Sequence, residues 1–185
     1  DILASLPSVI FGVWGTLVIV PIVSDIIGPA VGTATSGYTL LSGAVVLSVM
    51  ILPLLVSLFI EILGNVEIDL REASLALGAT RWQTTKHVVL KKGLPGIIAS
   101  TVLAISRALG ETIAVLMVCG NLIIIPDSLL DACYPIPALI ANNYGEMLSL
   151  PLYESALMFA AFILFFIVLV FNLGARLYLK TIKTE

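Results

Sequence analysis

Charge is scarce in this sequence. Only 11% of its 185 residues are charged, whereas 59% are apolar. Soluble globular chains carry about 25% charged residues, so this chain has too few to cover a surface that faces water. Intrinsic disorder is excluded by the same numbers, because it requires low hydrophobicity and high charge. The composition therefore predicts an integral membrane protein, and its apolar runs are long enough for helices rather than barrel strands.

Histidine and cysteine are also rare, which limits the chemistry that the chain can perform. The sequence has one histidine, His87, and two cysteines, Cys119 and Cys133. Neither cysteine lies in a metal-ligand spacing, so we expect no metal site. No Gly-x-Ser-x-Gly or His-Glu-x-x-His motif occurs, which argues against an intramembrane protease or lipid phosphatase. We expect the cysteines to be unpaired small residues, with a disulfide as the alternative if Cys133 is external.

Four apolar stretches are long enough to cross a membrane. A helix needs about 20 mostly apolar residues to span the bilayer core. The stretches lie at about residues 7–27, 40–63, 94–120 and 152–173. We therefore predict an all-α, polytopic transmembrane helix bundle, formed by residues 1–185 as one domain in contact with membrane lipid.

The basic residues predict how the chain is oriented. Segment 64–93 holds five Lys or Arg residues, whereas segment 121–151 holds three acidic residues and no basic one. The positive-inside rule places segment 64–93 and the basic C-terminus in the cytoplasm. Because a basic cluster between spans is a topology signal, no nucleic-acid partner is expected. Residues 138–148 on the external side could form a short helix. We expect this segment to be an ordinary covering loop rather than an external gate or a contact for a binding protein.

Within the basic segment, residues 72–82 predict a sharp turn between two short helices. Glu72 to Leu77 are mostly strong helix formers. Gly78 suits a left-handed cap at the end of that helix, and a second helix can begin near Thr80. A short helix with small residues at a turn suits a groove on another protein.

An arginine lies inside the third apolar stretch. Arg107 is 13 residues beyond Leu94, or about 20 Å along a helix, and a central Arg costs about 2.5–3.5 kcal/mol to insert. Glu111 follows four residues later and is expected on the same helix face. The pair is either a structural ion pair or part of a pathway, and ionisable groups at this depth usually face a cavity or pathway. A guanidinium suits a tetrahedral oxyanion.

The turn segment resembles the motif of permease subunits of ABC importers. The matching residues are Glu72-Ala73-Ser74, then Gly78, then Val88-Val89-Leu90, with Ser74 in place of an alanine and Lys91 in place of a proline. The resemblance implies a MetI-like permease fold with a cytoplasmic coupling helix that docks on an ATP-binding subunit. The docking residues that it implies are Glu72, Ala73, Ser74, Leu77, Gly78, Ala79, Arg81 and Trp82.

The third stretch resembles phosphate permeases of the Pst system, the PstC type more than PstA. The resemblance is carried by residues 107–115, Arg-Ala-Leu-Gly-Glu-Thr-Ile-Ala-Val. It implies that Ser106, Arg107, Glu111 and Thr112 line the substrate pathway. Molybdate, tungstate and sulfate permeases share the Arg-Ala-Leu-Gly-Glu core but usually continue with Phe, not Thr112. They are the alternative substrate class.

The same resemblance implies the number of spans in the full protein, its partners and its cellular location. Such permeases have six spans, so two N-terminal spans of a longer protein are expected to be absent here. The implied partners are an ATP-binding subunit that holds ATP and magnesium, a second homologous permease subunit in a heterodimer, and an external phosphate-binding protein. The chain itself is expected to bind no cofactor and, without a GxxxxGK[ST] loop, to hydrolyse no ATP. The implied location is the inner membrane of a prokaryote. A structural scaffold without a transport role would leave Arg107 and Glu111 unexplained.

Overall fold

The computed structural model describes residues 6–145 and 151–182. Within these residues the chain forms helices and no β-strand, and one isolated parallel bridge joins Gly120 and Cys133. Four helical stretches are long and apolar enough to cross a membrane. They are Ser8–Ala30, Leu40–Gly64, Arg81–Leu109 and Leu152–Leu179. The all-α, polytopic fold class expected from the composition is confirmed.

The first stretch is a helix with two wide turns. Each π-helical turn comes shortly before a proline, Pro21 or Pro29. Proline has no N–H and its ring crowds the carbonyl four residues earlier, and a wider turn accommodates that crowding. The segments in order are α1 (Ser8–Trp14), η2 (Gly15–Ile19), α2 (Val20–Ile22), η3 (Val23–Ile27) and α3 (Gly28–Ala30).

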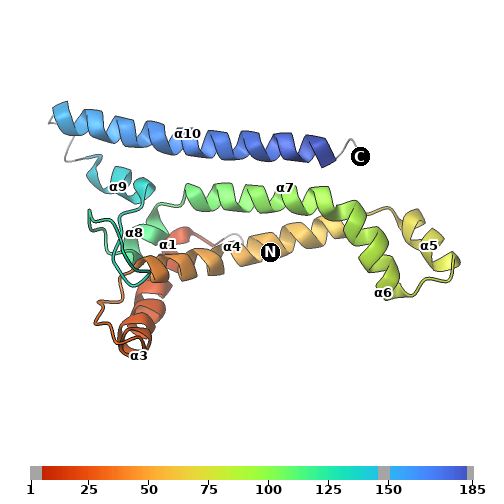
Figure 1. Cartoon of the computed structure of the whole chain (residues 1–185), viewed down its shortest axis with the longest axis horizontal. Coiled ribbons are helices and arrows are strands. Elements are labelled where there is room, and N and C mark those ends of the chain that lie inside the picture. Colours follow the sequence, from red (N-terminus) through yellow and green to blue (C-terminus); the bar gives the residue numbers. More distant parts are fainter. Residues whose placement is uncertain (1–5, 146–150, 183–185) are drawn as a thin grey trace.

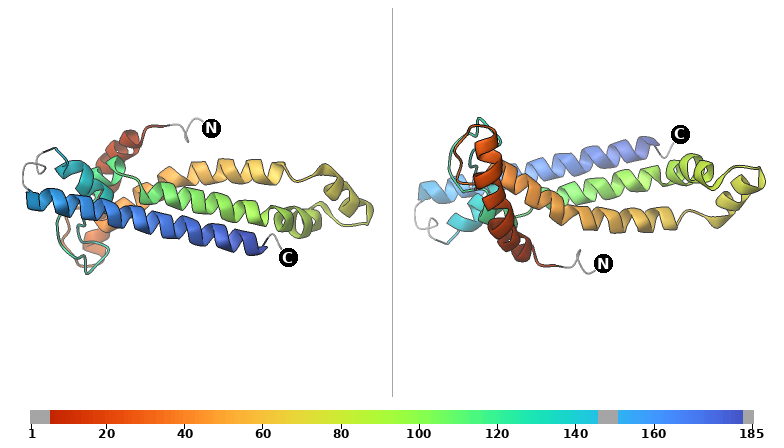
Figure 2. Two further views of the ribbon diagram at one scale, coloured as in Figure 1. Left: turned by 90° about the horizontal axis from the view of Figure 1, so that it is seen from above. Right: turned by 90° about the horizontal axis from the view of Figure 1, so that it is seen from below.

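Three long helices lie side by side. α7 (Leu90–Leu109) is in the middle and packs against both α4 (Leu40–Gly64) and α10 (Pro151–Ile182) (Figure 1). α4 and α7 approach closely at Gly96, where an added Cβ would lie 2.6 Å from Ile62. Small residues allow such close packing of membrane helices. Figure 2 shows that the first helical stretch lies across one end of these three helices.

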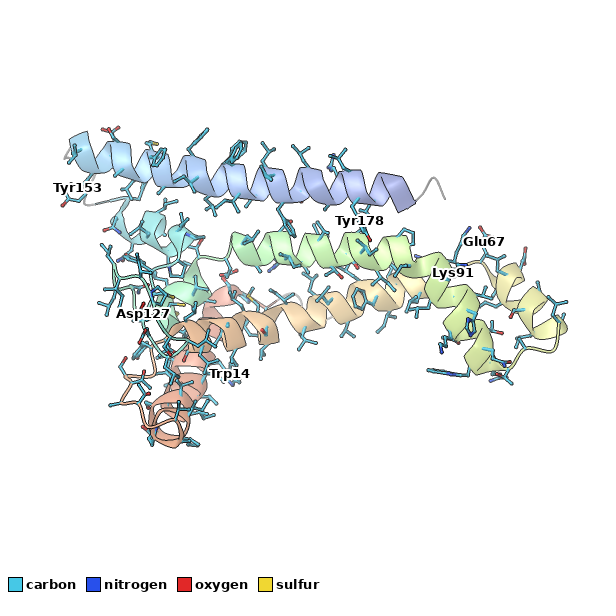
Figure 3. The ribbon with its side chains drawn as sticks, in the orientation of Figure 1. Trp14, Glu67, Lys91, Asp127, Tyr153 and Tyr178 are labelled. Carbon is cyan, nitrogen blue, oxygen red and sulfur yellow. The ribbon has the colours of Figure 1, made fainter. Side chains whose placement is uncertain are left out.

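The surface of α10 fits a lipid environment. Its apolar side chains are exposed along its length, including Phe162 and Phe166, whose rings stack with centroids 6.4 Å apart. Tyr153 and Tyr178 lie near opposite ends of the helix (Figure 3). The 25 steps along the helix from Tyr153 to Tyr178 span about 37 Å at 1.5 Å per residue. That length fits two aromatic anchors at the two membrane interfaces.

The buried core is small and lies where the first helical stretch meets α4, α8 (Ile113–Val118) and α9 (Ile136–Asn143). At the opposite end of the bundle a helical hairpin projects, formed by α5 (Ile68–Ala76) and by α6 (Arg81–Thr84), which continues through η4 (Thr85–Val89) into α7. The carboxyl end of α10 points toward the same end as this hairpin (Figure 1). The core residues are Val20, Val46, Ala114, Val115, Val118, Cys119, Cys133 and Ala138.

The third helix differs from the expected span of residues 94–120. It begins at Arg81 and ends at Leu109, because the chain turns at Gly110 before α8 begins. The expected helix at residues 138–148 is α9, which begins at Ile136 and ends at Asn143. Residues 146–148 of that expectation lie outside the described residues.

Candidate functional site: a projecting hairpin and an interrupted helix

The hairpin is held by local interactions that the sequence predicts. α5 ends at Ala76, and Gly78 takes the left-handed conformation with φ +86°. Thr80 then caps α6 in a capping box, because its hydroxyl accepts from the Gln83 N–H and the Gln83 side chain accepts from the Thr80 N–H. The predicted helix, left-handed glycine and second helix are confirmed, although α5 begins at Ile68 rather than Glu72.

One hydrogen bond closes the hairpin from inside. Ser74 of α5 and Thr84 of α6 are 3.0 Å apart between their hydroxyl oxygens. Thr84 is 4% exposed, and Ser74 is half-buried. Ser74 therefore joins the two helices rather than pointing outward. A serine at this position supplies a hydroxyl that the alanine of the permease motif would lack.

Arg71 joins the hairpin to the bundle, a role that the sequence analysis did not assign. Its Nη2 donates to the carbonyl of Leu63 in the last turn of α4. The last carbonyls of a helix have no partner within the helix, and a basic side chain can bond them. The signal in the sequence was the basic residue itself, seven positions after the end of α4 at Gly64. It was counted only toward the charge of the segment.

The tip of the hairpin exposes large apolar side chains. Leu77 is 90% exposed and Trp82 is 74% exposed. Of the eight residues expected to dock on a partner, Ser74 and Ala79 are half-buried. The other six are exposed, namely Glu72, Ala73, Leu77, Gly78, Arg81 and Trp82. An apolar surface with a polar rim marks a site for interaction with another protein.

The apolar stretch that was expected as the third span is interrupted beside Arg107. The N–H groups of Gly110 and Glu111 bond to the carbonyls of Arg107 and Ala108, three residues back. The helix tightens and stops there, so Glu111 does not lie one turn above Arg107. The expected pairing on one helix face is therefore wrong, and the two side chains form no ion pair in the described structure.

Glu111 caps the next helix instead. Its Oε1 accepts from the N–H of Ala114, at 3.3 Å, in the first turn of α8. The first N–H groups of a helix lack partners within the helix, and a carboxylate near them is stabilised by the helix dipole. Arg107 lies in the last turn of α7, where a positive charge is favourable, and its side chain is exposed.

Ser106 and Thr112 flank the interruption but face different neighbours. The Ser106 hydroxyl donates to the Val102 carbonyl and to Oδ1 of Asn172 on α10, at 3.1 Å. The Thr112 hydroxyl donates to the Gly110 carbonyl at 3.3 Å. The four residues expected in a pathway are thus close in the chain but do not converge on one point. Asn172 was missed, and its signal was an amide within an apolar run.

A cavity of about 330 Å³ lies beside the interruption, between α4, α7, α8, α9 and α10. Glu111 is its single charged lining residue, and Arg107 does not line it. An apolar cavity with one carboxylate does not suit an anion. The Arg107 side chain instead lies on the open face of α7. Within residues 6–145 and 151–182, no three metal-ligating side chains gather.

These features define an α-helical, multi-pass membrane protein with a projecting helical hairpin. The chain belongs to the family of binding-protein-dependent transport system inner membrane components, whose model matches residues 1–183.

The chain is similar to phosphate transport system permease protein PstC of Xylella fastidiosa, with 37% identity over 100% of this chain and 61% of that protein. It is similarly related to a probable PstC of Methanocaldococcus jannaschii, with 37% identity over 97% of this chain and 60% of that protein. A probable ABC transporter permease, YqgH of Bacillus subtilis, is 35% identical over 95% of this chain and 57% of its own length. The chain thus spans about three fifths of these relatives.

A solved structure shares the fold. It is a chain of the MetNI methionine ABC transporter in an inward-facing conformation, with a TM-score of 0.69 and 20% identity. The match covers 98% of this chain and 71% of that chain. The MetI-like permease fold expected from the hairpin motif is confirmed.

Proposed function

We propose that the chain is part of the permease subunit of an ATP-driven phosphate importer and forms half of its translocation pathway. The observation that carries this proposal is the similarity, over the whole chain, to permeases named for phosphate transport in a bacterium and an archaeon. The guanidinium of Arg107 supports it, because a planar fork of donors suits a tetrahedral oxyanion. A molybdate, tungstate or sulfate permease remains the alternative.

The hairpin would dock on an ATP-binding subunit. Within the described residues Leu77 and Trp82 are largely uncovered, and the hairpin that carries them projects beyond the long helices (Figure 1). Aromatic side chains that enter a pocket contribute much of the energy of protein interfaces. ATP binding and hydrolysis, which take place in that partner with its magnesium ion, would move the hairpin. This chain would carry the movement and hydrolyse no ATP itself.

The hairpin end of the bundle would lie in the cytoplasm of a prokaryote. Arg71, Arg81, Lys86, Lys91 and Lys92 lie in or beside the hairpin, and the positive-inside rule places such residues on the cytoplasmic side. The carboxyl end of α10, which points the same way, would also be cytoplasmic. The end with α8 and α9 would then be external, where a phosphate-binding protein would deliver substrate.

Arg107 would meet phosphate at an interface with a second permease subunit. Its side chain lies on the open face of α7 and outside the apolar cavity. A homologous subunit packed on that face would close a pathway around the guanidinium, and rocking of the two halves would give alternating access. Thr112 and Ser106 would then shape the pathway wall, and Glu111 would fix the helix end beside it.

Uptake by the assembled transporter tests this proposal. In proteoliposomes loaded with ATP, Arg107→Gln should lower phosphate uptake about tenfold or more, because charge-assisted hydrogen bonds contribute about 1.5–3 kcal/mol. Arg176→Gln, which removes an exposed arginine near the end of α10, should leave uptake near the wild-type rate. Unlabelled phosphate should compete better than molybdate or sulfate. Normal uptake by Arg107→Gln, with the complex assembled, would remove this residue from the pathway.

A further inference from the structure

The two cysteines of the chain meet although 14 positions separate them. Cys119 follows α8, and Cys133 lies shortly before α9. The Cys133 N–H donates to the Cys119 carbonyl at 2.9 Å, beside the bridge that joins Gly120 and Cys133. Both cysteine side chains are buried in the same core cluster. A disulfide requires adjacent backbones and side chains within reach of each other, and the backbone hydrogen bond and the shared core cluster of this pair favour both.

The pair is enclosed by the protein core. Cys119 is 2% exposed and Cys133 is 7% exposed, and both pack in the core cluster with Val118 and Ala138. Gly43 of α4 leaves the space that the Cys119 sulfur occupies, since an added Cβ there would overlap with the sulfur. Neither cysteine lies in the hairpin or beside Arg107. Residues 1–185 contain these two cysteines and no other.

We propose that Cys119 and Cys133 form an intrachain disulfide by exchange with a disulfide oxidant on the external side of the membrane. The external location rests on the proposed orientation, in which α8, α9 and the segment between them lie outside. Extracytoplasmic compartments allow disulfides to form and persist. The oxidant, a protein or small-molecule disulfide, receives two electrons and is released as two thiols.

The environment of the two sulfurs determines which of them reacts first. Both lie outside the four candidate spans. Burial raises the pKa of both thiols, and raises that of Cys119 to about 12 with a further contribution from Cys133. The neighbouring Cys119 lowers the pKa of Cys133, whereas Cys133 raises that of Cys119 further. Cys133 is also the more exposed of the two, and because the thiolate is the nucleophile, Cys133 attacks first.

The exchange proceeds in two steps. The Cys133 thiolate attacks one sulfur of the oxidant, forms a mixed disulfide and releases the first thiolate. Cys119 then loses its proton and attacks the Cys133 sulfur, which forms the Cys119–Cys133 bond and releases the second thiolate. The two protons of the cysteines neutralise the two released thiolates. The new bond ties the end of α8 to the segment before α9, so it restricts the helix that Glu111 caps.

Thiol labelling of the assembled transporter tests the proposal. The complex, with any cysteine elsewhere in the full protein replaced by alanine, is incubated with glutathione disulfide at pH 8.5. It is then denatured and labelled with maleimide–polyethylene glycol. Wild type should lose both labelled sites and gain no glutathione, and prior reduction should restore both. Cys119→Ala, which keeps the Cys133 thiol, should instead gain one glutathione.

Two controls make the result decisive. The rate of disulfide formation should rise between pH 7 and pH 9, because the thiolate fraction of Cys133 rises. The Cys119→Ala and Cys133→Ala double variant should show no labelled site and should assemble normally. If both wild-type thiols stay reactive to maleimide after the incubation, or if wild type keeps a stable glutathione adduct at Cys133, the proposal is overturned.

Discussion

Two helix interruptions in the described part of the chain, at Gly78 and Gly110, differ in what holds them. At Gly78 the backbone is left-handed, with φ +86°, and a complete capping box follows at Thr80. At Gly110 the backbone stays in the right-handed region, with φ −92°, and one carboxylate caps the next helix. The first interruption is specified by its own residues. The second depends on the cap that the Glu111 side chain provides and on the packing of the surrounding helices.

The largest effect is expected from replacing Gly78 with valine. No atom lies within 4 Å of the position that a Cβ would take there, so the added volume itself costs nothing. A left-handed conformation costs an L-residue about 1–2 kcal/mol, and asparagine tolerates it better. Gly78→Val should therefore distort the hairpin and uncouple ATP hydrolysis from transport. The ratio of ATP hydrolysed to phosphate imported measures the coupling.

Gly78→Asn provides the matched control, because it adds a side chain of similar size while accepting the left-handed backbone. We expect it to keep near-normal coupling. Equal loss in both variants would mean that the hairpin tip cannot accept any side chain in the complex, and the backbone argument would then be wrong. Normal coupling in Gly78→Val would count against the docking role of the hairpin.

The sequence predicts the hairpin well because its signals are local. Helix formers, a glycine and a Thr-x-x-Gln pattern occur within about a dozen residues, and each acts on neighbouring backbone. The interruption at Gly110 was missed because apolar residues continue on both sides, so hydropathy reads residues 94–120 as one span. A glycine with ordinary φ carries no strong local preference for a break. The polar pair Glu111 and Thr112 was the available signal.

The site around Arg107 could be predicted only in part. The sequence placed Arg107 within an apolar stretch. The resemblance to phosphate permeases indicated that its guanidinium lines a pathway for an oxyanion. The direction in which the side chain points depends on the packing of α7 between α4 and α10, which involves residues distant in the sequence. The contact between Ser106 and Asn172 has the same origin, since 66 positions separate the two.

A smaller effect is expected at Glu111, and it distinguishes the hydrogen bond of a helix cap from the effect of the negative charge. Removing a capping side chain costs about 0.5–2 kcal/mol. Glu111→Ala should lower the melting temperature of the purified complex by several degrees. Glu111→Gln keeps an oxygen that accepts from the Ala114 N–H, so it should lose less than half as much. Thermal unfolding in detergent measures both variants. Equal losses would instead show that the negative charge of Glu111, and not the hydrogen bond that its side chain accepts, stabilises the fold.

The smallest effect is expected where Ser106 of α7 meets Asn172 of α10. Hydrogen bonds between membrane helices contribute about 0.6 kcal/mol on average and at most about 1.7. A double-mutant cycle with Ser106→Ala and Asn172→Leu should therefore give a coupling energy of about 0.5–1.5 kcal/mol. Asn172 also donates to the Val168 carbonyl within α10, so its single replacement costs more than the coupling alone. A coupling energy of zero would mean that α10 is held against the interrupted helix by apolar packing alone, and that the Ser106 hydroxyl is satisfied within α7 by the Val102 carbonyl.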